Sequence, residues 1–390
     1  MSHAAIAIPG LDRIGGAERQ AILLAKGLRG RGWKVSAVAL SGTGGAAAEE
    51  LRDAGVAFVS LKMRKGLADL RGWVRFNRWL WRERPDVLHA HLPHAAWMAR
   101  WSRLAAPVPV VIDTLHSSYA GGMGRQIGYR CSRWLADHVT AVSHATAESH
   151  LAAGMVSEDR LTVLGNGIDV DAWRPDAATR TRVRRALGLT EEFLWLAAGR
   201  LEAVKDFPAL LAAMAGGPQT AQLVVLGEGP LRAELGRLAA RLGLERRVRF
   251  AGFEPDVARW MQAADGFVLT SRYEGLPMVL LEAGACGVPT VATDVVGIRE
   301  VIVNRETGWL ARAGDAKELT AAMTRLMQVP SEERRTMGER ARRLVVERFS
   351  LEKVLDEWEK LYAELLDQRT ARRMRLSEWA ILNRRSETSV

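Results

Sequence analysis

Short runs of Val, Ile and Leu alternate with longer helical patterns along most of the chain, and this alternation is the strongest constraint on its fold. Strands that alternate with helices form a parallel sheet with helices on both faces. The expected strands are Ala4–Ile8, Val35–Leu40, Asp86–Ala90, Val108–Thr114, His138–Val142, Trp195–Gly199, Leu223–Gly227, Val248–Phe250, Gly266–Thr270 and Thr290–Thr293.

The alternation stops between residues 165 and 190, where turn-forming and charged residues replace a strand, and then restarts. With 390 residues the chain is long enough for two domains. We expect an α/β protein of two domains with a connecting cleft, residues 1–175 and 176–350, followed by a closing helix and a basic tail at 351–390. Ligands of such sheets bind beyond the carboxyl ends of the strands, so the loops after strands are where chemistry is expected.

Composition excludes several classes of protein. The two cysteines, Cys131 and Cys286, are far apart, which excludes a disulfide scaffold and a cysteine zinc cluster and favours a reducing compartment. The first residues lack a basic segment followed by a long apolar stretch, and no run approaches the roughly 18–20 apolar residues of a membrane span. The sequence therefore predicts a cytoplasmic protein.

The net charge of +10 is concentrated in two segments. Residues 61–84 hold eight Lys and Arg against two Asp and Glu, and residues 369–390 hold six Arg against two Glu. In the first segment arginines recur at helical spacing, with apolar residues between them. The arginines are Arg71, Arg75, Arg78 and Arg82, the expected apolar positions are Leu70, Trp73, Val74, Leu80 and Trp81, and Trp79 lies close to the arginine stripe.

Three interpretations of these basic segments stay open. The helix could be a core-packed element with a solvated face, whereas arginines beside indoles are also typical of a helix on an anionic membrane. Nucleic acid is the least favoured partner, because no helix-turn-helix, zinc-finger, KH or RNP pattern accompanies the charge.

Two loops of the first half could carry chemistry. In GLDRIGGAE, Gly15 and Gly16 allow close backbone approach, and the helix N-terminus behind them favours an anion, although a plain tight turn explains the loop as well. The pattern is not the GxGxxG dinucleotide fingerprint. His116 follows a strand in TLH, where it could orient or donate to a substrate hydroxyl or phosphate, or be an ordinary surface histidine.

The segment His89-Ala-His91 raises the question of a metal site. Alternate residues of a strand point to the same side, so the two imidazoles could share a ligand. No acidic residue or cysteine stands nearby at ligand spacing. A polar cluster at the wall of the cleft is therefore the favoured interpretation, and no metal is expected.

The second half offers cations and carboxylates after its strands. Arg200 and Lys205 lie where a strand ends and a helix begins, an arrangement that suits a pyrophosphate, although a solvated pair is the alternative. Glu274 and Glu282 are separated by seven residues, and the helix between them starts near Pro277. Glu282 lies within an apolar helix, where a carboxylate needs hydrogen bonds, and the paired hydroxyls of a ribose would supply them.

Several motifs in a fixed order resemble the retaining GT-B glycosyltransferases of family four. They are GGAE, HAH followed by TLH, AVS at 141–143, NGID at 166–169, GRLEAVKDF, VVLGEGPLRAEL, RVRFAGFEPDV, the two glutamates seven residues apart, TDVVGIREVI and NRETGWL. The resemblance implies two Rossmann-like domains facing each other across a cleft. The second domain would bind most of the nucleotide sugar and the first the acceptor. The last helix, Leu351–Asp367, would cross back onto the first domain.

The resemblance also implies roles for single residues. Arg200 and Lys205 would neutralise the diphosphate, Glu274 would contact the sugar near the reacting carbon, and His116 would contact the sugar or the acceptor. Glu282 would hold the ribose. The implied donor-binding residues are Gly16, Gly199, Phe253, Glu254, Gly275, Leu276, Pro277, Met278, Val279 and Glu282, of which Phe253 and Glu254 would border the base and Met278 and Val279 would offer free N–H groups to a phosphate.

Two positions depart from the family pattern. Asp206 stands where glycine or asparagine is common and adds a negative charge beside the phosphate site, and Val296 replaces a second glycine. The stretch Asp169-Val-Asp171 matches the DxD of metal-dependent transferases, but it belongs to the NGID turn and is interpreted as structural.

The expected activity is that of a metal-independent hexosyltransferase without a cofactor. It would move a sugar from a nucleotide sugar, for which UDP is favoured, to a hydroxyl of a lipid-linked or polysaccharide acceptor, as in cell-surface polysaccharide synthesis. In such enzymes a same-face attack is the usual mechanism, so Glu274 is assigned to positioning and electrostatics. A sugar-nucleotide epimerase on the same fold and a basic nucleic-acid-binding protein are the alternatives, and the basic segments would dock on the inner face of a membrane.

Overall fold

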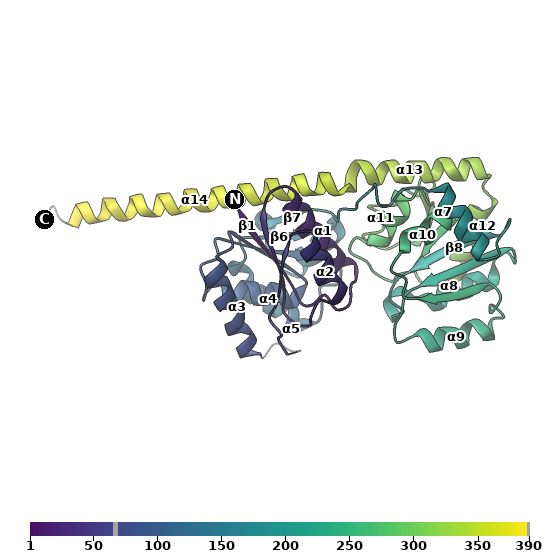
Figure 1. Ribbon diagram of the computed structural model, residues 1–390, viewed down its shortest axis with the longest axis horizontal. Coiled ribbons are helices and arrows are strands. Elements are labelled where there is room, and N and C mark those ends of the chain that lie inside the picture. Colours follow the sequence, from purple (N-terminus) through teal and green to yellow (C-terminus); the bar gives the residue numbers. More distant parts are fainter. Residues whose placement is uncertain (65–68, 388–390) are drawn as a thin grey trace.

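Figure 1 shows the computed structural model of the chain, which describes residues 1–64 and 69–387 and gives only the backbone at 373 and 376–387. Part of the first basic segment, residues 65–68, and the last residues of the second, 388–390, lie outside the described residues. Two parallel sheets, of seven and six strands, form the cores of two α/β domains.

The first sheet has the strand order β3-β2-β1-β4-β5-β6-β7. Its strands are β1 (His3–Ile8), β2 (Lys34–Ala39), β3 (Ala57–Ser60), β4 (Val87–His91), β5 (Val110–Leu115), β6 (His138–Ala141) and β7 (Leu161–Val163). The α-helices that connect them are α1 (Gly16–Gly30), α2 (Gly45–Asp53), α3 (Leu70–Glu83), α4 (Pro93–Ser102), α5 (Met123–Ser132) and α6 (His144–Ala152).

The second sheet has the order β10-β9-β8-β11-β12-β13. Its strands are β8 (Phe193–Ala198), β9 (Ala221–Leu226), β10 (Val248–Gly252), β11 (Gly266–Leu269), β12 (Thr290–Thr293) and β13 (Gly308–Ala311). The α-helices are α7 (Ala177–Ala186), α8 (Phe207–Gly216), α9 (Arg232–Arg241), α10 (Val257–Ala263), α11 (Met278–Ala285), α12 (Ala316–Gln328), α13 (Ser331–Phe349) and α14 (Leu351–Glu387).

The strand orders identify where each sheet should bind a ligand. The chain order reverses between β1 and β4 in the first sheet and between β8 and β11 in the second. Crevices form beyond the carboxyl ends of strands at such reversals. The fold therefore places the loops after β1, β4, β8 and β11, which hold most of the candidate residues, at these two points.

The strands predicted from the sequence all form, but three short strands and one helix were missed. β3, β7 and β13 have three or four residues each, lie at sheet edges and are only partly buried, so they lack the continuous apolar run of a central strand. The charged segment RTRVRR, which lies within 165–190 where the alternation stops in the sequence, belongs to α7, and this helix packs against α10. Pro330 lies between α12 and α13 and separates the two helices.

The basic helix α3 forms where predicted, and Trp73 and Leu80 pack on the core as expected, but the other apolar positions were misassigned. Phe76, Trp79 and Leu80 are buried against the sheet, whereas Leu70 and Trp81 are exposed beside the arginines. The buried positions recur every three or four residues and thus define the core-facing side. Val74 is exposed as well, so the arginine face also carries apolar side chains.

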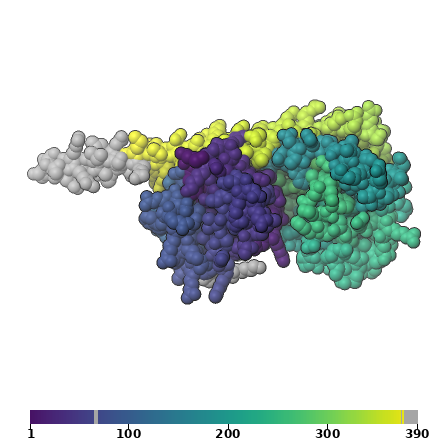
Figure 2. Space-filling view, viewed as in Figure 1, coloured from purple at the N-terminus to yellow at the C-terminus, as the bar shows by residue number. Residues whose placement is uncertain are grey.

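The last helix, α14, crosses from the second domain onto the first (Figure 1), and the space-filling view shows it along the edge of that domain (Figure 2). Its side chains Trp358 and Tyr362 are buried in the same core as α1 and β1. Arg31 of the first domain donates hydrogen bonds to Asp356 and Glu359 on the helix. The packed part ends near Leu366, as far as the sequence predicted a closing helix, but the helix itself continues to Glu387.

No helix within the described ranges is both long enough and apolar enough to cross a lipid bilayer.

Candidate functional site

Lys205 and Glu274, one from each loop at the strand reversal of the second sheet, form an ion pair. Nζ of Lys205 lies 2.6 Å from Oε1 of Glu274, and the two side chains are 18% and 15% exposed. Thr270 holds the first loop in place by donating from Oγ1 to the carbonyl of Lys205 at 2.7 Å. The structure therefore brings together two predicted catalytic residues that lie far apart in the sequence.

The extra negative charge of Asp206 is neutralised locally. This residue is buried at the start of α8 with φ of 47°, and Nε of Arg272 lies 3.1 Å from its carboxylate. The departure from the family pattern at this position therefore adds an ion pair beside the site and leaves no uncompensated charge on the phosphate side. The other departure, Val296, is exposed.

The N-termini of α1 and α11 meet at the contact between the domains. A Cβ atom on Gly16, the first residue of α1, would lie 3.4 Å from Cγ of Met278, the first residue of α11. The first-turn N–H groups of a helix have no partner within the helix and carry partial positive charge. Two such termini in contact form a place for an anion such as a diphosphate.

Glu282, on the same helix, has a carboxylate that no hydrogen bond or ion pair reaches among the residues described. Burial raises its pKa to about 7, and the charge of Arg19 acts in the opposite direction. A half-buried carboxylate without partners is costly. A ligand with two adjacent hydroxyl groups would satisfy both of its oxygens.

The loop after β5 brings His116 and Ser118 of the first domain to the Glu274 loop. Oγ of Ser118 donates to the carbonyl oxygen of Glu274 at 2.7 Å. A Cβ atom on Gly275 would lie 2.3 Å from the carbonyl oxygen of His116, so only glycine permits this approach. Burial lowers the pKa of His116 to about 4, which keeps the imidazole neutral near pH 7.

The two histidines of HAH are bound to protein groups. His89 contacts the hydroxyl of Tyr362 at 2.7 Å and that of Thr114 at 2.6 Å, so it is held partly by α14. Nδ1 of His91 lies 2.9 Å from Nε2 of His116. In the described part of the chain, no group of three or more His, Cys, Asp or Glu side chains could hold a metal ion.

Asp169 of the DxD-like stretch accepts hydrogen bonds from the N–H groups of Asp171 and Ala172 within its own turn. The first aspartate is thereby engaged in capping the NGID turn. The neighbouring Asn166 also has a role in the turn, because its Nδ2 donates to the carbonyl of Leu276 at 2.8 Å across the domains.

Three other predicted residues, Arg200 of the catalytic set and Phe253 and Glu254 of the donor-binding set, lie outside the contacts described above. The Arg200 side chain is 72% exposed and lies 3.2 Å from Glu202. Phe253 is 70% exposed, and the carboxylate of Glu254 binds Arg259 at 2.6 Å. Gly275, Leu276 and Met278 lie at the contact between the domains, whereas Pro277 and Val279 belong to the same segment at the start of α11. Gly199 lies beside the Lys205 side chain.

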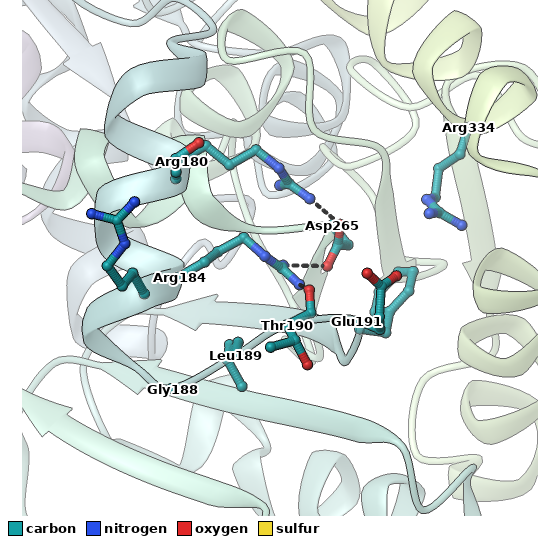
Figure 3. A pocket seen from close by; sticks show the side chains of 11 residues that line it. Arg180, Arg184, Gly188, Leu189, Thr190, Glu191, Asp265 and Arg334 are labelled. Atoms are coloured by element: carbon teal, nitrogen blue, oxygen red, sulfur yellow. Dashed lines mark hydrogen bonds and ion pairs between the residues drawn. The ribbon is translucent and has the colours of Figure 1, made fainter.

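A basic hollow lies at the other end of β8, where Phe193 begins the strand (Figure 3). Arg180 and Arg184 both bind Asp265 there, and Arg334 lies opposite them on α13. Two of the arginines thus brace α7 against the β11 region. The hollow is remote from the loops that follow the carboxyl ends of the strands.

Sequence reasoning missed Ser118, Arg272 and Arg19. Ser118 lies two residues after His116, in a glycine-rich loop without a recognisable pattern, and Arg272 matters only because the fold places it beside Asp206. Arg19, whose charge acts on Glu282, lies one turn into α1, and this position behind the glycine loop was the sequence feature that could have identified it.

Comparisons with known proteins match both halves of the chain. The family described as Glycosyltransferase Family 4 matches residues 14–172, and the one described as Glycosyl transferases group 1 matches residues 179–344. N-acetyl-alpha-D-glucosaminyl L-malate synthase of Bacillus anthracis is 31% identical over 294 residues, 73% of this chain and 76% of that protein.

Two further proteins extend the comparison. UDP-Gal:alpha-D-GlcNAc-diphosphoundecaprenol alpha-1,3-galactosyltransferase of Escherichia coli is 23% identical over 77% of this chain and 81% of its own. The crystal structure of Anabaena HepE in complex with UDP and glucose superposes with a TM-score of 0.82, at 22% identity, over 93% of this chain and 99% of that one.

Two parallel-sheet α/β domains, joined where the loops after their strand reversals meet, form the GT-B fold. The chain belongs to glycosyltransferase family 4.

Proposed function

We propose that the protein is a retaining, metal-independent hexosyltransferase that moves a sugar from a UDP-sugar to a hydroxyl of a lipid-linked or polysaccharide acceptor. The observation that carries this proposal is the Lys205–Glu274 pair in the loop that leads into α11, whose N-terminus meets that of α1. This arrangement suits a diphosphate leaving group beside a carboxylate. A relative whose name includes a UDP-galactose donor and a diphosphoundecaprenol acceptor supports the choice of substrates.

The residues of the site supply the charge that the reaction needs. When the bond between the sugar carbon and the diphosphate breaks, the leaving oxygen gains negative charge, which Lys205 and the first-turn N–H groups of α11 offset without a metal. The acceptor oxygen attacks from the same face and its proton passes to the leaving diphosphate. Glu274 acts as a positioning carboxylate, which Lys205 holds in place at 2.6 Å.

A panel of UDP-, GDP- and ADP-sugars, offered with broad acceptors and EDTA, tests this proposal. We expect release of UDP that depends on the acceptor, together with an α-linked product from an α-linked donor. Conversion of the donor without acceptor would favour an epimerase. No turnover on any donor would contradict the proposal.

The affinity for a UDP-sugar should depend on pH through Glu282. Its carboxyl has a pKa of about 7 and must be ionised for both oxygens to accept hydrogen bonds from the ribose, so calorimetry with UDP-glucose should give about tenfold weaker binding at pH 6 than at pH 8. The folded pKa lies above the ordinary value of 4.5, so the same group makes the free protein less stable as pH rises from about 4.5 to 7.

The matched variant Glu282→Gln keeps the shape of the side chain and removes its titration. We expect uniformly weaker binding without this pH dependence. An equally steep pH dependence in Glu282→Gln would assign the effect to another group.

We also propose that the exposed face of α3 docks the enzyme on the cytoplasmic face of an anionic membrane, where a lipid-linked acceptor resides. The face combines exposed Leu70, Val74 and Trp81 with Arg71 and Arg78. Indoles favour the membrane interface and arginines attract anionic headgroups. The following segment, Leu88 to Ala136, includes α4 and α5 and adds no exposed negative charge. Its sole carboxylate, Asp113, is buried against Arg100.

Co-sedimentation with vesicles of phosphatidylcholine, with and without phosphatidylglycerol, tests this surface. The triple variant Arg71→Gln, Arg78→Gln, Arg82→Gln should lose most of its binding to anionic vesicles. The control carries the same charge change on exposed arginines of the second domain, Arg237, Arg241 and Arg340, and should bind as the parent protein does. Equal binding by the two variants would reject α3 as the docking face.

A further inference from the structure

His91 is a buried side chain to which the proposed chemistry gives no role. It is 1% exposed, and its Nδ1 lies 2.9 Å from Nε2 of His116. Its other ring nitrogen, Nε2, is buried without a hydrogen-bond partner among the residues that the structure describes. A buried polar atom without a partner is costly, so the burial of this nitrogen needs an explanation.

The hydrogen bond between the two histidines leaves two possible distributions of protons. Burial lowers the pKa of both groups, so both rings are neutral near pH 7 and one must donate while the other accepts. If His116 donated, the proton of His91 would lie on the buried Nε2 and have no acceptor. If His91 donates, its buried Nε2 carries only an unpaired acceptor lone pair. This is the less costly arrangement, since buried N–H groups without a partner are rarer in proteins than buried acceptors without one.

We propose that His91 is a positioning residue, whose Nδ1–H donates a hydrogen bond to Nε2 of His116. The proton of the neutral His116 ring then lies on its own Nδ1. Within the described part of the chain, Nδ1 of His116 has no protein partner, so it is the atom that remains for a ligand. This assignment rests on the proposed function, and it makes His116 a neutral N–H donor to an oxygen of the sugar or of the acceptor. It excludes His116 Nδ1 as a general base.

The C-terminal helix contributes to this arrangement through His89. The rings of His89 and His91 are 4.2 Å apart, and His89 is itself held by Tyr362 and Thr114. The ring of Trp358, also on α14, lies 4.5 Å from that of His89. β4 is paired on both sides, so His91 sits on a rigid strand beneath a helix that joins the two domains.

The proton positions can be measured directly in the unmodified protein. Nitrogen-15 NMR of the full chain labelled at histidine distinguishes the two tautomers of each imidazole. We expect the Nδ1–H tautomer for both His91 and His116. An Nε2–H tautomer at His116 would overturn the assignment, whatever the activity of the enzyme.

Two isosteric variants then link the proton to turnover. Asn at position 91 can still donate towards His116, whereas Asp can only accept. We expect His91→Asn to keep kcat within about tenfold of the parent and His91→Asp to lose about a hundredfold or more. Since the second domain binds most of the donor, the Kd for UDP should be unchanged in both.

Circular dichroism and thermal melting of both variants provide the control for folding. Equal losses of kcat in the two variants would show that His91 acts only through packing and would overturn the proposal. If the tautomers are as expected but no donor in the panel is turned over, the proposed function fails while the proton assignment stands.

Discussion

The variant Lys205→Ala should lose about a hundredfold to a thousandfold in kcat, the range seen when one preorganised donor to a developing oxyanion is removed. Its Nζ, 2.6 Å from Glu274, is held near the N-terminus of α11. Without it, the leaving diphosphate would lose the cation that the proposed site assigns to it, and the largely buried Glu274 carboxylate would lose its ion-pair partner. Steady-state kinetics with the active UDP-sugar measures the effect.

Lys317→Ala is the matched control, because this lysine is exposed on α12 of the same domain. We expect its turnover to equal that of the parent enzyme. Lys205→Arg should recover part of the loss, since it restores charge but not the shape of the ammonium group. If Lys205→Ala turned over within about threefold of the parent, the diphosphate would have to bind elsewhere.

The largest effect on stability is expected from Asp113→Ala. Asp113 on β5 binds Arg100 of α4 through two hydrogen bonds of 2.9 and 3.0 Å, and the two side chains are 1% and 0% exposed. Removing one partner leaves a buried charge uncompensated, which costs about 3–5 kcal/mol. Urea unfolding should show this loss, and β5, which delivers His116, should be affected first.

The control for this prediction is an exposed pair. Glu339→Ala removes the partner of Arg335 on the surface of α13 and should cost about 0.5 kcal/mol or less. The double change Arg100→Met, Asp113→Leu should restore most of the stability, because apolar side chains can replace a buried ion pair. A loss below about 1 kcal/mol in Asp113→Ala would contradict the proposed role of the pair.

Much of the fold could be predicted from the sequence, because central parallel strands are buried on both faces and read as continuous apolar runs. Edge strands such as β7 are short and half-buried, so their pattern is weak. The charged composition of α7 concealed a helix whose arginines bind Asp265 of the β11 region. In α3 the helical period was predicted correctly. Tryptophans fit either the buried or the exposed side of an amphipathic helix, so only the packing against the core shows which of them are buried.

The site residues could be predicted where they lie together in one loop of the sequence. They could not be predicted where the register of the sheet determines which side chains meet. The glutamates of α11 and its loop stand out in the sequence. The contact of His91 with His116 arises because His91 pairs in register with Thr114, two residues before His116. The charge of Asp206 looked unfavourable in the sequence, and only the folded loop shows that Arg272 neutralises it.

A crystal structure of the protein with a bound UDP-sugar tests the central claim most directly. We expect the diphosphate at the junction of the α1 and α11 N-termini, within hydrogen-bonding distance of Lys205, and the ribose hydroxyls on Glu282. Density for the nucleotide in the basic hollow between Arg184 and Arg334, with the junction empty, would contradict the assignment of the site.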